Sequence, residues 1–549
     1  MQSYLPQLFT VLKGYSKKQF FNDLSAGIIV AIIALPLSIA LAIASGVSPE
    51  KGLYTAIIGG FIVSFLGGSK VQIGGPTGAF VIIVLGIINQ YGLEGLITAT
   101  IMAGFFLIIM GVFQFGSMIK YIPYPITTGF TSGIAVTIFS TQVKDFLGIQ
   151  ANGAPSEFIE QWSFYFNHLN TIHLHTLFIG ILSLLILIFW PKISKKIPGS
   201  LIAVIVSTLI VSFFNLDVET IGSRFGEIPS TLPKPTLPFA TFDTIKELLH
   251  PSITIALLAA IESLLSAVVA DGLINGKHRP NMELIAQGAA NIGSAIFGGI
   301  PVTGAIARTA ANIKNGGKTP ISGIVHSIVL FLIMTFFMPY AKLIPMSCLA
   351  AILIMVAYNM SEWRSFVSLF KAPKSDIAVL LITFILTIFF DLVVAIEIGI
   401  VLASILFMKR MSDVTSIETT IRELNDQPDG DMDEEMHSDN MSDKVMVYDI
   451  NGPFFFGAAD TFINIVRSMQ KLPKVLVIRM KKVPAMDATA CHALQGLLKK
   501  CRKNKTKVFF THVRPQPLRT LQNYGIIEEL GEDAICSSTD EAIKKANIA

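Results

Sequence analysis

Long apolar stretches separated by short polar ones fill the first three quarters of the chain. Several are shorter than the ~20 residues that a helix perpendicular to a membrane needs. This pattern predicts an α-helical membrane protein with fourteen transmembrane segments. They lie at 24–44, 53–66, 77–88, 95–115, 126–143, 174–190, 199–214, 251–270, 282–298, 302–312, 321–341, 345–358, 376–391 and 393–408.

A short motif occurs twice in these stretches. Gly75–Ala79 is Gly-Pro-Thr-Gly-Ala and Pro301–Ala305 is Pro-Val-Thr-Gly-Ala, at an offset of 226 residues (303 − 77). The fourteen segments therefore divide into two repeats of seven, at about 20–214 and 250–408. Because seven is an odd number, we expect the second repeat to be inverted across the membrane.

Each motif opens a segment too short to cross a bilayer, the third (77–88) and the tenth (302–312). Broken helices at matching places in two repeats are typical of secondary transporters, whose binding sites they form. A helix N-terminus carries unpaired N–H groups and about half a positive charge. Two such ends that face one cavity would attract an anion, so the sequence predicts an anion site.

Composition agrees with a membrane transporter. Hydrophobic residues make up 52% of the chain and charged residues 15%, and the mean hydropathy is +0.62. Lys and Arg concentrate in alternate loops, which places both ends of the chain in the cytoplasm. The four cysteines have neither disulfide nor metal spacing. With no nucleophile–base pair or phosphate-binding loop, we expect no enzyme, no metal and no cofactor.

The chain changes character after the last apolar stretch. We assign 1–410 to a transmembrane domain and 411–443 to an acidic linker rich in Asp and Glu. From 444 to 549, helical patterns alternate with strand-like runs, which predicts a compact cytosolic α/β domain. The predicted strands are Val445–Ile450, Val475–Met480 and Lys507–Thr511.

The candidate substrate-binding residues lie at the two motifs. Thr77 and Thr303 are expected to head the short helices, where their hydroxyl groups either cap the helix or donate to the anion. Small residues also suit close helix packing, so position and not residue type carries this prediction. The neighbours expected to offer backbone N–H groups and space for the ligand are Gly78, Ala79, Gly304 and Ala305.

Two charged residues inside the apolar segments are candidates for a functional role. Glu262 is mid-way along the eighth, where a charge costs at least ~2.5–3.5 kcal/mol on insertion scales and usually faces a cavity. Desolvation favours a neutral carboxyl group, so Glu262 could take up a proton with the anion; alternatively it is a permanently hydrogen-bonded structural group. Arg308 in the tenth segment either adds positive potential behind the site or extends to the surface or an acidic partner.

Together these residues carry a resemblance to a known family. The chain resembles the SulP anion transporters (solute carrier family 26) with a C-terminal STAS domain, and is similar to bacterial members of the dicarboxylate and sulfate-permease type. The resemblance covers essentially the whole chain. It rests on the segments Gly75–Ala79, Gly129–Ile134, Pro301–Thr309, Gly317–Gly323 and Met486–Thr489.

The resemblance implies a uracil-permease-like core of segments 1–4 and 8–11 that moves against a gate of segments 5–7 and 12–14 as an elevator. It also implies a homodimer in a bacterial cytoplasmic membrane, ion coupling at Glu262 and a functional arginine at Arg308. Related bacterial STAS domains that act in signalling are phosphorylated at the position of Thr489. That residue is a candidate regulatory phosphosite, with an ordinary helix cap by Asp487 or Thr489 as the alternative.

We therefore expect a secondary active transporter of sulfate, bicarbonate or a C4-dicarboxylate, working by H⁺ symport in the lipid bilayer. The family's bicarbonate members couple to Na⁺ through an Asp at the position of Glu262, which favours H⁺ here and leaves Na⁺ as the alternative. A nucleobase permease, an anion channel and a membrane-anchored STAS signalling protein remain open. The basic cluster at 499–507 indicates a solvated or membrane-facing surface and not nucleic-acid binding.

Overall fold

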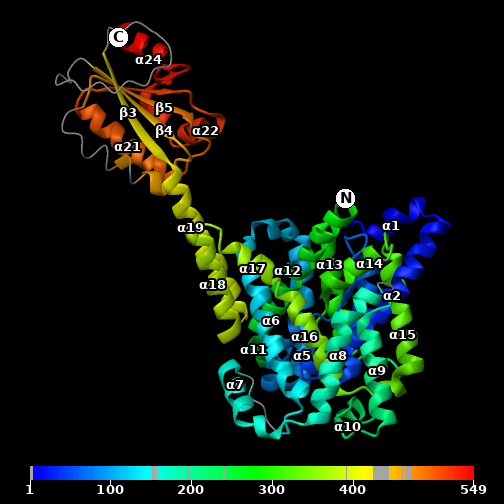
Figure 1. Ribbon diagram of the computed structural model, residues 1–549. Coiled ribbons are helices and arrows are strands. Elements are labelled where there is room, and N and C mark those ends of the chain that lie inside the picture. Colours follow the sequence, from blue (N-terminus) through cyan, green and yellow to red (C-terminus); the bar gives the residue numbers. More distant parts are fainter. Residues whose placement is uncertain are drawn as a thin grey trace. The chain divides into compact units, whose positions relative to one another are not determined.

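The computed structural model describes residues 4–150, 155, 157–194, 197–238, 241–390, 392–423, 444–459, 462–463 and 472–548. The chain forms two compact units, Met1–Ile400 and Val401–Ala549. Figure 1 shows that the first is built from helices and that the second contains a sheet with helices around it.

The first unit begins with a short helix and a long one and contains two very short strands, β1 and β2. Pro, Gly and polar residues stand at most helix ends, where they interrupt the apolar runs. Its elements are α1 (Gln7–Val11), α2 (Lys17–Ala44), α3 (Pro49–Tyr54), a π-helical turn (Thr55–Gly59), α4 (Gly60–Leu66), β1 (Gly74–Gly75), α5 (Phe80–Val112), α6 (Tyr124–Leu147), α7 (Phe158–Asn167), α8 (Leu174–Ile193), α9 (Gly199–Phe213), α10 (Ile221–Phe225), α11 (Phe242–Glu247), α12 (Leu249–Ile274), α13 (Pro280–Ile296), β2 (Thr303–Gly304), α14 (Ile306–Lys314), α15 (Ile321–Ala341), α16 (Met346–Met360), α17 (Trp363–Leu369), α18 (Lys374–Phe389) and α19 (Leu392–Val414).

Each of the fourteen predicted stretches lies largely on helix. The third and fourth join into α5, which breaks at Gly92, where a φ of 69° is a conformation that glycine adopts without a steric penalty. Among the described residues, six helical stretches are long and apolar enough to cross a membrane on their own. The number fourteen and the inversion of the second repeat stay predictions.

The helices of the first unit pack mainly within two groups. One group contains α2, α4, α5, α12, α13, α14 and α15, with α5 against α12 and α13 and with α2 against α15. The other contains α6, α8, α9, α16 and α18, with α6 against α16 and α18. In both groups, helices from the first half of the chain pack against helices from the second half.

The second unit contains a five-stranded sheet in the order β3-β4-β5-β6-β7, in which β3 is antiparallel to β4 and the other pairs are parallel. One sheet face packs against α21 and the other against α24. The elements are β3 (Ser416–Glu423), β4 (Lys444–Asn451), β5 (Val475–Lys482), α21 (Ala488–Lys503), β6 (Lys507–Thr511), α22 (Pro515–Asn523), α23 (Ile526–Leu530), β7 (Ile535–Cys536) and α24 (Thr539–Ile548).

The three predicted strands of this unit are present, but the assignment of 411–443 to a linker is partly wrong. Residues 411–414 continue α19, and 416–423 form β3, which pairs with β4 along its whole length. The strand alternates Ile417, Thr419 and Ile421 with charged or polar residues, and its acidic members resemble the acidic run that follows. The residues from 424 to 443, which hold that run, lie outside the described part.

Candidate substrate site

The two sequence motifs meet in space. Strands β1 and β2 pair antiparallel, with Gly74 opposite Gly304 and Gly75 opposite Thr303. Each strand precedes a helix: residues 76–79 separate β1 from α5 in the first half of the chain, and Ala305 separates β2 from α14 in the second. The broken places of the two halves therefore form one structure inside the first helix group.

The short helices start later than predicted. The residue before α5 is Ala79 and the residue before α14 is Ala305, and neither helix start has a side-chain cap. Thr77 and Thr303 therefore do not head the helices, and the capping interpretation is wrong for both. The early Pro and Gly residues favour extended backbone. In the second motif, strand pairing also uses Thr303 and Gly304, which were expected to be helical.

Both threonine hydroxyls instead bind α12. Thr303 Oγ1 donates to the carbonyl oxygen of Ala259 at 3.1 Å, and Thr77 Oγ1 donates to the Glu262 carboxylate at 2.7 Å. The Glu262 side chain is 8% exposed. Among the described residues, no basic side chain lies within ion-pair distance of it. An acidic group without a cationic partner thus lies next to the first motif.

Arg308 is buried at the same place. It is the third residue of α14 and only 1% exposed. Its Nη2 donates to the carbonyl oxygen of Pro76 at 2.5 Å, but Nε and Nη1 have no hydrogen-bond partner in the described part of the chain. A buried, permanently charged group with unsatisfied donors is costly, so this guanidinium group favours an additional acceptor or a negative charge nearby.

A side chain at position 75 would displace the Arg308 guanidinium group from its present position. A Cβ atom there would lie 2.0 Å from Arg308 Nη1, a distance too short for any real Cβ contact. Gly78 faces the other way: a Cβ at 78 would lie 2.8 Å from Ile138 Cδ1 on α6 and 2.9 Å from Met360 Sδ on α16. The first motif thus lies between Arg308 and the second helix group.

The predicted N–H donors are partly occupied. The Ala305 N–H donates to the carbonyl oxygen of Ile73 at 2.9 Å, so this amide is not available to an anion, contrary to expectation. Directly after the first motif, the N–H groups of Phe80 and Val81 donate to the carbonyl oxygens of Thr77 and Gly78. The available donors are therefore fewer than two bare helix ends would offer, which raises the importance of Arg308.

Several side chains that join the two motifs could not be singled out from the sequence. Asn312 Nδ2 donates to the Val71 carbonyl oxygen at 2.9 Å, and Thr309 Oγ1 accepts from the Ile73 N–H at 3.1 Å. Gln72 Nε2 donates to the carbonyl oxygen of Ser263 at 3.2 Å. Asn, Thr and Gln are common in all parts of proteins, and their spacing carries no signal of these long-range bonds.

A cavity of about 1040 Å³ lies between the two helix groups, lined by Ala40 of α2, Leu85 of α5, Gln142 of α6 and Leu353 of α16 among others. At its rim Arg224 contacts Asp145 at 2.7 Å and Glu219 at 2.5 Å. Burial lowers the pKa of Arg224, but the two carboxylates outweigh it and hold that pKa above its ordinary value. Asp145 is near the end of α6 and Arg224 is on α10, so this triad lies beside the second helix group.

In the second unit, Asp487 caps α21. Its Oδ1 accepts from the Ala490 N–H at 2.9 Å and its Oδ2 from the Phe456 N–H at 3.2 Å. The expected cap at this helix is therefore provided by Asp487. Thr489 lies exposed in the first turn, and its role as a phosphosite stays a prediction.

Residues 20–383 match the Sulfate permease family. The chain belongs to this family. Residues 439–542 match the STAS domain. The chain is 41% identical over 534 residues to a Bacillus subtilis protein named "Putative sulfate transporter YvdB", covering 96% of this chain and 98% of that protein. It is 29% identical over 537 residues to the bicarbonate transporter BicA of Picosynechococcus, covering 96% and 94%.

Solved structures agree. The chain resembles the structure of the murine Solute Carrier 26 family member A9 anion transporter in the inward-facing state, with a TM-score of 0.87 at 17% identity. The match covers 100% of this chain and 94% of that one and shows a likeness of fold. The transmembrane domain of BicA has a TM-score of 0.62 at 29% identity over 71% of this chain and 98% of that one. Membership of the SulP family with a C-terminal STAS domain is confirmed, as is a helical membrane transporter fold.

Proposed function

We propose that this sulfate permease family member is a secondary active transporter of a small anion, sulfate, bicarbonate or a C4-dicarboxylate, bound beside the β1–β2 pair. The observation that carries this proposal is the buried Arg308, whose Nε and Nη1 lack partners in the described part of the chain. The guanidinium group contacts the first motif through Pro76. An oxyanion there would supply the missing acceptors and the opposite charge.

The remaining contacts would come from the motif residues. Thr77, Gly78 and Ala79 form the short segment between Arg308 and the second helix group. Their small side chains leave space, and the start of α5 adds positive potential. Thr303, Gly304 and Ala305 support this segment from the other half of the chain, since β2 pairs with β1 and Ala305 is bonded to Ile73.

We propose that Glu262 couples transport to H⁺. Its carboxyl group accepts a hydrogen bond from the hydroxyl of Thr77, and Arg308 donates to the carbonyl oxygen of the preceding residue, Pro76. A carboxylate and an anion at such close range in a water-poor region repel each other strongly. A proton on Glu262 removes this repulsion, so that proton and anion bind together and cross together.

The movement would be an elevator. The group that holds the motifs, Glu262 and Arg308 packs mainly within itself, and so does the group of α6, α8, α9, α16 and α18. The first group would carry the anion past the second, within a homodimer in the bacterial cytoplasmic membrane. We place the N-terminus and the STAS domain on the cytoplasmic side, because the positive loops fall on that side.

Uptake by the purified full-length protein in liposomes tests this function. Labelled sulfate, bicarbonate, succinate and fumarate are supplied with and without an inward proton gradient. Accumulation of one anion that depends on the gradient is the expected result. Uptake that is independent of the proton gradient but requires Na⁺ would favour the second candidate, a Na⁺-coupled bicarbonate transporter. The 29% identity to the bicarbonate transporter BicA supports bicarbonate as its substrate. Absence of uptake for every anion under both gradients would contradict the proposal.

A further inference from the structure

The β6 strand of the STAS domain has an edge that its neighbour leaves largely unpaired. On one side, β6 pairs with β5 along its whole length, from Lys507 to Thr511. On the other side, β7 has two residues and pairs only with Phe510 and Thr511. The first part of β6 therefore borders no strand of the described chain on that side.

The backbone of Val508 points toward this edge. The Lys507 N–H donates to the Lys474 carbonyl oxygen, on the β5 side. The His512 N–H donates to the Cys536 carbonyl oxygen, on the β7 side. Because alternate residues of a strand address opposite neighbours, Val508 directs its N–H and carbonyl groups to the β7 side, below the point where β7 begins.

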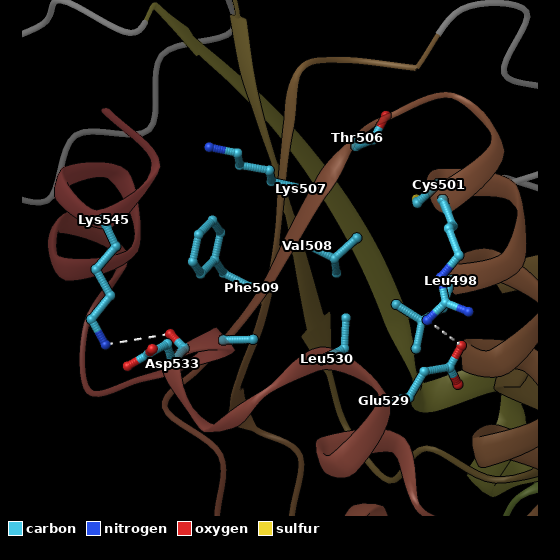
Figure 2. Close-up of a pocket in the computed structure, with 12 residues that line it drawn as sticks. Leu498, Cys501, Thr506, Lys507, Val508, Phe509, Glu529, Leu530, Asp533 and Lys545 are labelled. Carbon is cyan, nitrogen blue, oxygen red and sulfur yellow. Dashed lines mark hydrogen bonds and ion pairs between the residues drawn. The ribbon is translucent and has the colours of Figure 1, made fainter. Parts of the chain in front are cut away.

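A groove of about 560 Å³ lies along this edge (Figure 2). Val508 and Phe509 point to opposite sides of β6, Val508 toward Leu498 and Cys501 of α21, and Phe509 toward the α24 side, where Lys545 lies. The groove thus has a small apolar surface on each side of the sheet edge, because Leu498, Cys501, Val508 and Phe509 are each less than a tenth exposed. Alternate side chains of a strand would find one apolar surface each.

The two ends of the groove differ in charge. Six of the nine residues from 499 to 507 are basic, and Lys507 stands at the start of β6. At the other end lie the acidic residues Glu529 and Asp533. Of these, Glu529 is paired with Arg502 at 2.9 Å. A ligand that fills the groove along β6 would therefore need negative charge at the Lys507 end.

We propose that this groove binds an extended segment of a partner protein, which adds a strand to β6 and places acidic residues beside Lys507. Main-chain bonds to Val508 would give affinity, and the two apolar surfaces would select alternating apolar side chains. The unpaired part, Lys507 to Phe509, spans about 10 Å at the rise of a strand. That length accommodates a short peptide segment, and charge complementarity sets its direction.

The test uses the full-length protein in nanodiscs and a fluorescein-labelled peptide, Asp-Asp-Val-Thr-Val-Thr-Val. We expect saturable binding by fluorescence anisotropy and slower hydrogen exchange in the segment 505–511. The same peptide with N-methyl groups on alternate residues removes main-chain donors and should not bind. No saturable binding up to ~1 mM, or equal binding of the methylated peptide, would overturn the proposal.

A charge reversal locates the site. Lys507→Glu changes an exposed side chain, so the fold should be retained, and peptide affinity should fall about tenfold because one attraction becomes a repulsion. Lys481→Glu is the matched control, an equally exposed lysine at the far end of β5, and should leave affinity unchanged. Equal loss in both variants would mean general electrostatic attraction and would overturn the strand-addition site.

Discussion

Replacing Glu262 by glutamine separates proton coupling from binding. The glutamine amide oxygen can still accept the 2.7 Å hydrogen bond from Thr77, so the local structure should persist. The proton-binding group is lost. A gradient of one pH unit supplies about 1.4 kcal/mol, which is a tenfold concentration ratio for an anion that moves with one proton. We expect the wild-type protein to approach that ratio and Glu262→Gln to equilibrate the anion without accumulating it.

The assay is uptake of labelled anion into liposomes to steady state, inside pH 7.5 and outside pH 6.5 (about one unit). Thr77→Val is the control, because it removes the hydrogen bond and keeps the carboxyl group. A hydrogen bond to a charged group contributes about 1.5–3 kcal/mol, so this variant should transport more slowly but still accumulate. Tenfold accumulation by Glu262→Gln would refute proton coupling at this residue.

Three other substitutions test the site and the STAS domain. Arg308→Gln should lower initial uptake at least tenfold, because an amide can still donate to Pro76 but carries no charge. Size-exclusion chromatography should show a folded protein, and normal uptake would exclude Arg308 from the site. Gly75→Ala should lower the melting temperature and uptake together, because overpacking against Arg308 lowers the free energy of unfolding by about 1–3 kcal/mol. Gly86→Ala is the control: a Cβ atom at position 86 meets nothing within 4 Å, so neither quantity should change. Asp487→Ala should cost about 0.5–2 kcal/mol in denaturant unfolding of the STAS domain through loss of the α21 cap; an unchanged midpoint would contradict that capping role.

The apolar pattern predicts where the helices lie, and the repeated Gly-rich motif predicts that a helix is interrupted at equivalent places in the two halves. Both signals are local or come from a repeat within the chain, so a single sequence is enough to detect them. The strand β3 was missed because its acidic members continue into an acidic run, and its pairing with β4 depends on residues beyond the strand itself.

The contacts of the site are a different matter. Thr77 and Glu262 are separated by 185 positions and meet only through the packing of α5 against α12. The occupied N–H of Ala305 depends on the exact register of β1 and β2, which a motif alone does not specify. Residue type and position therefore nominate candidate groups, whereas their bonding partners required three-dimensional structure.

The bonds between the two motifs have a consequence for biosynthesis. Pro76 receives its hydrogen bond from Arg308, 232 residues later, and Val71 receives its bond from Asn312, 241 residues later. At about 5–20 residues per second, a ribosome needs roughly 10–50 s to make that stretch. For that time the carbonyl groups of Val71 and Pro76 lack these donors, and exposing them to lipid would cost several kcal/mol each. The nascent first half must therefore remain next to water or the insertion machinery until its complement emerges.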